Sequence, residues 1–341
     1  MYIATDGNGI WKFPYNSTSS TTGVKIASAG IGRAWGIALD KSDNIYVADN
    51  SSSSIKMFPP NTTITTVPKT VAIGNGSNQL SNTRDLFIDK DGAIFVADLG
   101  NNRIQKFPAG SDATTSGITV AGGNGAGNAA NQLNSPVSMC TDLQGNLYVA
   151  DAGNNRIQKF PAGSTSTTNG TTIGTVNSME SNHTKIYVDS RGYIYISGTA
   201  GVYRFPPNAI ASSTGLKLTS TAVNGDRAQM GSVLIDSLGY IYNTEYYNQK
   251  LYKWRQNFAA TSYKPTVAGN YTASVTSYVG CPSLPSNTVV IGSPILVQPS
   301  LASQTLCTGA NGATISVLTT GSGLTYQWYK NTIQSLSLIH I

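Results

Sequence analysis

Charge is scarce in this sequence. Only 11% of the 341 residues are Asp, Glu, Lys or Arg, against about 25% in an average soluble domain. The formal net charge is +6, but the basic residues are scattered singly, without the runs or Arg-rich strips that bind nucleic acid. The basicity therefore reflects a shortage of acidic residues, and we expect no nucleic-acid partner.

Long apolar runs, cysteines and histidines are also few. No stretch of about 20 apolar residues occurs, so the sequence predicts no membrane insertion. With three Cys, two His and no C-x-x-C pair, we expect neither a metal site nor a cofactor. Cys140 lies in an apolar run and is predicted to be a small buried residue. No amphipathic helix pattern appears, which favours an all-β chain.

A short phrase repeats along the chain, and each strong copy is followed by the same hook. Residues 89–98 read DKDGAIFVAD and residues 142–151 read DLQGNLYVAD, and the hooks LGNNRIQKF and AGNNRIQKF follow them. Weaker copies begin at Asp40, Asp189 and Asp236, and residues 1–13 carry the back half of one more. A self-similar period of about 50 residues indicates a solenoid or a propeller.

Each complete unit contains four short runs of β-branched and aromatic residues separated by turn residues, which is the pattern of strands. In the third unit these strands, named A to D, are predicted at 84–89, 93–98, 103–107 and 117–121. Four-stranded units of this length are typical of β-propeller blades. The first unit lacks strand A in this sequence. We expect either that residues upstream, including a signal peptide, precede Met1, or that a later strand closes the ring.

The phrase N-x-Y-V-A-D-x-x-N-N-R-I-Q-K-F, with T-V-A-G-G-N-G before it, resembles the NHL repeat, in the version found in secreted bacterial surface proteins. The resemblance covers roughly residues 1–254 and is strongest in the third and fourth units. In the fifth and sixth units, Gly198 and Glu245 stand where the family has Asp. The resemblance implies an all-β, six-bladed propeller over residues 1–269 with an incomplete first blade, in an extracellular or cell-surface location.

A second pattern follows the repeats. Residues 293–334 resemble the front half of a bacterial immunoglobulin-like domain, which implies that Trp328 packs against a disulfide formed by Cys307. Residues 261–269 can serve as strand D of the sixth blade, and residues 270–292 are either a linker or the rear half of a similar domain. Whether residues 259–292 complete the propeller or belong to an immunoglobulin-like domain stays open. This order predicts incomplete sandwich segments and leaves the pairing of Cys281 and Cys307 open. Residues 335–341 are predicted to be a non-native tail, with a strand as the alternative.

Aspartates recur at fixed positions, but repetition argues against catalysis. Residues 89–92 resemble a fragment of a calcium loop, yet every unit has the same turn and the later acidic ligands are missing. The aspartate that ends strand B is expected to accept hydrogen bonds from the next turn. We therefore predict no catalytic residue and no enzyme. The alternatives are a lyase or lactonase-like propeller, with clustered carboxylates or histidines at the channel, and a purely structural spacer.

Chain direction gathers the B–C turns and the D–A loops on one face, here called the loop face, because strand A starts where B and D end. The loops at 73–82 and 121–134 belong to it. Binding residues tend to lie on loops held by a rigid scaffold. The candidate ligand-binding residues are Asp98, Asn101, Asn102, Arg103, Asp151, Asn154, Asn155 and Arg156.

Each of these residues has a simpler interpretation as part of a turn. Asp98 with Arg103, and Asp151 with Arg156, are expected to form partly exposed pairs worth at most about 1 kcal/mol. As a whole, the sequence predicts a non-enzymatic, extracellular binding or adhesion module. It would be a monomeric part of a larger bacterial surface protein, with a protein or glycan ligand on the loop face.

Overall fold

The structure, a computed structural model, describes residues 1–5, 9–14, 17–18, 20–73, 79–176, 179, 184–198, 201–218, 230–235, 240–245 and 250–255, with the short strands 269–271, 274–277, 289–291 and 337–340. The chain divides into two compact units, Met1–Leu234 with Asn243–Tyr252, and Ile235–Tyr242 with Lys253–Ile341. Its regular elements are strands and short 3₁₀ turns. Within the described part, no helix is long and apolar enough to cross a membrane.

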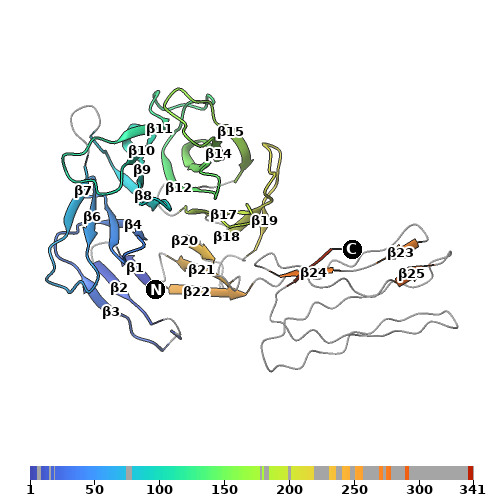
Figure 1. Ribbon diagram of the computed structural model, residues 1–341, viewed down its shortest axis with the longest axis horizontal. Helices are drawn as coiled ribbons and strands as arrows, with labels where there is room; N and C mark the ends of the chain where they lie inside the picture. Colours follow the sequence, from blue (N-terminus) through green and yellow to red (C-terminus); the bar gives the residue numbers. More distant parts are fainter. Residues whose placement is uncertain are drawn as a thin grey trace. The chain divides into compact units, whose positions relative to one another are not determined.

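Six antiparallel sheets follow one another along the chain and form the blades of a β-propeller (Figure 1). Blade 1 contains β1 (Tyr2–Thr5), β2 (Gly9–Lys12) and β3 (Val24–Ala27). Blade 2 contains β4 (Ala34–Leu39), β5 (Ile45–Asp49), β6 (Ser54–Phe58) and β7 (Lys69–Ala72). Blade 3 contains β8 (Thr83–Ile88), β9 (Ile94–Asp98), β10 (Arg103–Phe107) and β11 (Ile118–Gly122).

The later blades repeat the same order. Blade 4 contains β12 (Pro136–Thr141), β13 (Leu147–Asp151), β14 (Arg156–Phe160) and β15 (Thr171–Thr175). Blade 5 contains β16 (Ile186–Val188), β17 (Ile194–Gly198), β18 (Gly201–Phe205) and β19 (Leu216–Lys217). In blade 6 the described strands are β20 (Met230–Ile235), β21 (Tyr240–Glu245) and β22 (Lys250–Arg255). In each sheet, strands that are consecutive in sequence are hydrogen-bonded neighbours.

The predicted strands of the third unit are confirmed to within one residue at each end. Blade 1 has three strands, as expected for a first unit without strand A, and β1 packs beside β4. From blade 2 onward, strand A is the innermost strand, and β4, β8, β12 and β16 pack side by side around the centre. The start of each A strand pairs with the end of strand B, as Thr83 does with Asp98. The loop face is therefore formed as the chain direction predicted.

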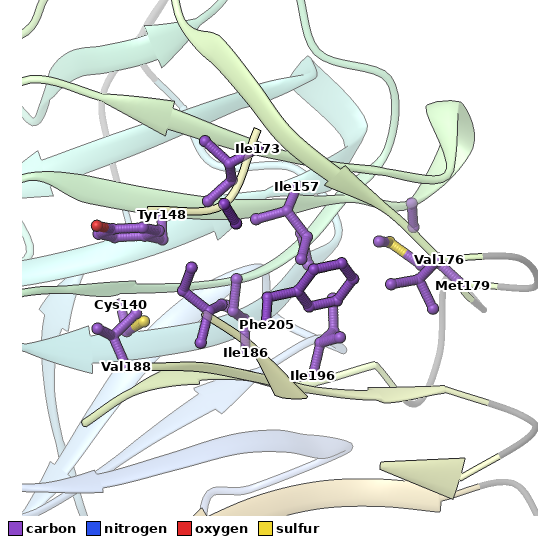
Figure 2. Packing of buried hydrophobic residues seen from close by; sticks show 14 of the residues in the cluster. Cys140, Tyr148, Ile157, Ile173, Val176, Met179, Ile186, Val188, Ile196 and Phe205 are labelled. Carbon is purple, nitrogen blue, oxygen red and sulfur yellow. The ribbon is translucent and has the colours of Figure 1, made fainter. Parts of the chain in front are cut away.

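The core lies between neighbouring blades. Figure 2 shows the cluster between blades 4 and 5, where the ring of Phe205 lies near Ile157, Ile186 and Ile196. Cys140 belongs to this cluster and is buried, as predicted, and burial raises the pKa of its thiol to about 12. The phenylalanine that ends strand C is fully buried in blades 2 to 5, at Phe58, Phe107, Phe160 and Phe205.

The second unit contains two described strand pairs. β23 (Gly269–Tyr271) pairs with β25 (Val289–Ile291), and β24 (Ser274–Ser277) pairs with β26 (Ser337–His340), both antiparallel. Strand β26 falls in the segment 335–341, for which both the non-native tail and its alternative stay predictions. Cys281, Cys307 and Trp328 lie outside the described residues, so the immunoglobulin-like resemblance stays a prediction.

Candidate ligand-binding loop face

The B–C turn of blade 3 is built around the buried carboxylate of Asp98. Its Oδ2 accepts a hydrogen bond from Arg103 Nε at 2.7 Å, and its Oδ1 accepts one from the Ser81 backbone N–H at 2.7 Å. Asn101 Nδ2 donates to the same carboxylate and, at 2.9 Å, to the carbonyl of Gln79. The turn is thereby joined to the loop that precedes the blade.

Blade 4 repeats this arrangement. Asp151 accepts hydrogen bonds from Arg156 Nε at 2.7 Å, from Asn154 Nδ2 at 2.7 Å and from the Asn134 backbone N–H at 2.7 Å. Burial raises the pKa of Asp151, while these three donors act to lower it. The prediction of a partly exposed Asp–Arg pair is wrong in both blades. The Arg103 and Arg156 side chains are only 10% and 11% exposed, and both Asp98 and Asp151 are fully buried, because the loops before the blades cover them.

Arg156 also organises the long loop between blades 3 and 4. Its guanidinium donates to the carbonyls of Asn128 at 2.7 Å, Ala129 at 3.1 Å and Gln132 at 2.8 Å. Asn154 adds a hydrogen bond to the carbonyl of Gly127 at 2.9 Å. In blade 3, Arg103 makes one such contact, to Gln79 at 3.3 Å. The two arginines occupy the same position in the repeat but hold different amounts of loop backbone.

The second asparagine of each hook has a left-handed backbone. Asn102 and Asn155 both have φ of 52°, a conformation that Asn tolerates better than most residues. The side-chain oxygen of Asn102 accepts a hydrogen bond from the Ser135 backbone N–H at 2.9 Å, and that of Asn155 accepts one from Met179 at 3.1 Å. Each asparagine therefore connects its turn to the start of the next blade.

The family comparison agrees with this repeated geometry. The NHL-repeat family model matches residues 32–58 and 133–160. The chain contains NHL repeats. No curated protein sequence matches it.

Solved structures with the same fold include a chain of a protein–protein complex and a gluconolactonase. A chain of a nidogen–laminin complex is 17% identical with a TM-score of 0.57, over 75% of this chain and 88% of that chain. A gluconolactonase from Xanthomonas campestris is 13% identical with a TM-score of 0.52, over 70% and 76% of the two chains. At these identities the similarity establishes the propeller fold alone.

The eight predicted site residues thus gather at the B–C turns of blades 3 and 4, and every one of them makes hydrogen bonds within the fold. Seven are buried or half-buried, and Asn155 is exposed. Their contacts assign them to the turns and to the loops that these turns hold. That they also touch a ligand stays a prediction.

The A–B turns of the NHL blades lie at the opposite end of the strands. Asp89, in the fragment that resembles a calcium loop, accepts hydrogen bonds from the backbone N–H groups of Asp91 and Ala93, each at 2.9 Å. Asp40 and Asp142 make the same pair of bonds in their own turns. Among the described residues, no group of three or more His, Cys, Asp or Glu side chains could hold a metal ion.

A polar network across blades 3, 4 and 5 was missed by the sequence prediction. The buried Asp85 of β8 accepts hydrogen bonds from Lys185 Nζ at 2.5 Å and from Ser138 Oγ, on β12, at 2.6 Å. Ser138 Oγ accepts in turn from the Ile186 backbone N–H at 3.1 Å. Asp85 and Ser138 stand third in their A strands, and Lys185 stands at the corresponding place in the repeat, just before β16. This position varies between Gly, Asp, Ser and Lys along the repeat. Variation at a position on the innermost strand was the sequence signal that could have revealed this network.

Proposed function

We propose that this chain is a non-enzymatic binding or adhesion module of a larger extracellular bacterial surface protein, and that it binds a protein or glycan ligand on its loop face. Because the eight predicted residues make hydrogen bonds within the fold, the proposed ligand contacts lie on the exposed loops that cover them. Asp98, Arg103, Asp151 and Arg156 form the supporting layer, and the exposed residues of the loops that they hold would meet the ligand.

The observation that carries this proposal is the anchored loop at 123–134. Residues 123–126 and 128–130 of this loop are exposed, yet its backbone is held by Arg156 and Asn154 from blade 4. Asn124 Nδ2 adds bonds to the carbonyls of Asn131 at 2.9 Å and Ser166 at 2.6 Å. An exposed loop that is fixed before binding loses little conformational entropy when a ligand binds. A purely architectural spacer has no need of such a surface.

A protein is the first ligand class to test, because a chain from a nidogen–laminin complex has this fold. The fold is shared with a gluconolactonase as well, so an enzyme is the alternative. The buried Asp85 favours the binding function. Both of its oxygens already accept hydrogen bonds, one from Ser138 and one from the ammonium group of Lys185, so this carboxylate is engaged within the fold.

The test is a screen of the full chain against protein and glycan arrays, followed by a blocking variant. Ala129→Arg with Ala130→Arg places bulk on the exposed loop and leaves its backbone carbonyls in place. Leu143→Arg is the matched control, because Leu143 is 71% exposed on an A–B turn at the opposite end of the strands. We expect the loop variant to weaken binding by about tenfold or more, since it adds bulk and charge to the exposed surface where the ligand is proposed to bind, and the control to leave it unchanged.

A second variant tests the eight predicted residues. Combined replacement of Asn101, Arg103, Asn154 and Arg156 by alanine should weaken binding and also lower the melting temperature, because these side chains hold the loop. Equal affinity of the loop-blocking variant and the parent chain would refute the loop face as the ligand surface. Turnover of a lactone by the parent chain would favour the enzyme.

A further inference from the structure

Three residues at the junction of blades 2 and 3 depart from the repeat. Strand A of blade 2 begins with Ala34-Trp35-Gly36, and strand A of blade 3 begins with Thr83-Arg84-Asp85. At the position of Trp35 and Arg84, blades 4 and 5 carry Val137 and Thr184. Arg33 stands where the next blades have an uncharged Asn or Ser. A binding site that serves one ligand need not repeat in every blade, so such departures mark candidates.

The departing side chains meet on the loop face. The guanidinium carbon of Arg84 lies 4.4 Å from the centre of the Trp35 ring, and that of Arg33 lies 5.6 Å from it. Trp35 and Arg84 are half-buried and Arg33 is exposed. Both strands start at the loop-face end, because Ala34 pairs with Asp49 and Thr83 pairs with Asp98. Two cations therefore lie around one indole at the inner edge of this face.

The backbone holds this cluster in place. The pairing register shifts between Ala34 and Gly36 and again between Thr83 and Leu86, which places Trp35 and Arg84 in β-bulges. Bulges re-aim side chains and are common beside functional sites. A Cβ at Gly36 would lie 2.8 Å from the Asp85 Cα, so the two strands approach closely here, and only glycine permits this approach.

The Arg84 side chain is half-buried, and part of its guanidinium group has no hydrogen-bond partner in the part of the chain that the structure describes. Its Nε is buried and has no hydrogen-bond partner among the described residues, although burying an unpaired charge is costly. Burial and the neighbouring charge of Arg33 lower its pKa. The nearby carboxylates are already engaged. Asp85 binds Lys185 and Ser138, and Asp49 accepts bonds from the backbone of Gly32 and Arg33 and from Ser52.

We propose that Arg84, with Trp35 and Arg33, forms a carboxylate-binding site, and that its ligand is an Asp or Glu side chain of a protein partner. The proposal deepens the loop-face binding function and rests on it. A carboxylate matches the planar fork of a guanidinium, and it would compensate the charge of the half-buried Arg84 side chain. Arg and Trp are also the residues that most often dominate protein–protein binding energy.

A protein carboxylate fits better than a stacked sugar. A neutral sugar ring would need an open aromatic face, whereas the Arg84 guanidinium already lies over Trp35 at 4.4 Å. A neutral ligand would also leave the charge of Arg84 uncompensated. The expected partner is therefore an acidic segment, whose attraction to the site weakens as salt screens the charges.

The test measures binding of a blocked hexaglutamate peptide to the full chain by calorimetry, with hexaglutamine as the neutral probe. We expect hexaglutamate alone to bind, with weaker affinity at higher salt. Arg84→Gln should weaken binding by about tenfold or more, and Arg84→Lys should retain part of it. The matched control is Arg204→Gln, because Arg204 also stacks on an aromatic ring, 4.9 Å from Tyr193 in the A–B turn at the other end of blade 5.

Folding is followed by thermal melting. Arg84→Gln should melt at the same temperature as the parent chain or higher, because it removes an unpaired charge. Unchanged hexaglutamate binding by Arg84→Gln, or tighter binding of an oligogalacturonate than of hexaglutamate, overturns the proposal. If the Ala129→Arg/Ala130→Arg variant loses its ligand while Arg84→Gln does not affect hexaglutamate, the loop-face function stands and the carboxylate site fails. If hexaglutamate binds through Arg84 but the arrays yield no ligand, the carboxylate site stands and the loop-face function fails.

Discussion

At the scale of single residues, the aspartate that ends strand B accepts a hydrogen bond from the arginine that begins strand C in both strong repeats. The two arginines differ in their other contacts. Arg103 and Arg156 both pair with this aspartate at 2.7 Å. Arg156 also binds three loop carbonyls, whereas Arg103 binds one. Breaking a buried pair leaves an uncompensated charge, which costs far more than the pair itself contributes. Because Arg156 makes more carbonyl contacts, we expect it to contribute more to the free energy of unfolding than Arg103 does.

We expect Arg156→Ala to lower the free energy of unfolding by about 3–5 kcal/mol, and by more than Arg103→Ala does. The reason is that Arg156→Ala strands the Asp151 carboxylate and releases the loop at 123–134. Urea denaturation measures both variants. Lys90→Ala is the control, because the Lys90–Asp91 pair is highly exposed, at 76% and 70%, and its loss should leave the free energy of unfolding nearly unchanged. Equal losses for the two arginine variants would contradict the role given to the loop contacts.

The A–B turn gives the fold a pH dependence. Burial acts to raise the pKa of Asp40, but the hydrogen bonds from Asn44, Ser42 and Tyr46 outweigh it and lower the pKa below 3.8. A lowered carboxyl pKa stabilises the fold above the unfolded value, and this stabilisation is lost as the pH falls through the folded value. The stability difference between the parent chain and Asp40→Asn should therefore shrink on acidification below about pH 4. Melting temperatures between pH 3 and 7 check this, and a difference that grows on acidification would show the sign to be wrong.

At the scale of elements, the sequence predicted the strands and the face on which the B–C turns lie, because hydrophobic alternation and turn residues are local signals. It did not predict the burial of Arg103 and Arg156, since nothing local says which loop covers a side chain. The β-bulges at Trp35 and Arg84 were also missed. Without an alignment, a single extra residue at the start of a strand looks like ordinary strand sequence.

A contact between the end of strand C and the residue before strand D was also missed by the sequence prediction. The glycine before strand D lies against the phenylalanine that ends strand C, so that a Cβ at Gly117, Gly170 or Gly215 would lie 2.7–2.8 Å from the ring. The repeated Lys-Phe-Pro segment and this glycine are about ten residues apart. Their contact follows from the register of the two strands.

Gly170→Ala should therefore destabilise the fold by about 1–3 kcal/mol through overpacking against Phe160. Adding Phe160→Leu to Gly170→Ala should recover part of this loss, because the smaller side chain makes room for the new methyl group. Gly163→Ala is the comparison variant, since its Cβ would meet nothing within 4 Å and the φ of +76° tests backbone strain alone. Denaturation of these three variants, and of Phe160→Leu alone, separates the effects. A double variant no more stable than expected from the two single changes would argue against the contact.

At the scale of the whole molecule, the blades are joined by apolar packing and by the polar network at the centre. Asp85, Ser138 and Lys185 come from blades 3, 4 and 5, so that one carboxylate connects three separate sheets. The two charged members differ in exposure. The Asp85 side chain is 4% exposed, and that of Lys185 is 26% exposed. Removing either charge breaks the same ion pair but leaves a different partner behind.

This asymmetry makes a prediction about the cooperativity of the propeller. Lys185→Met leaves the buried Asp85 carboxylate without its cation and should cost about 3–5 kcal/mol. Asp85→Asn leaves an ammonium that water can reach, together with an amide oxygen that still accepts from Ser138, and should cost less, about 1–3 kcal/mol. Because the network joins three blades, Lys185→Met should also separate their unfolding, so that protease cleavage within blade 5 begins at a lower urea concentration than cleavage within blade 3. Denaturation followed by limited proteolysis measures both effects. If Asp85→Asn is the more damaging change, or if the blades still unfold together in Lys185→Met, then apolar packing rather than the central ion pair makes the blades one cooperative unit.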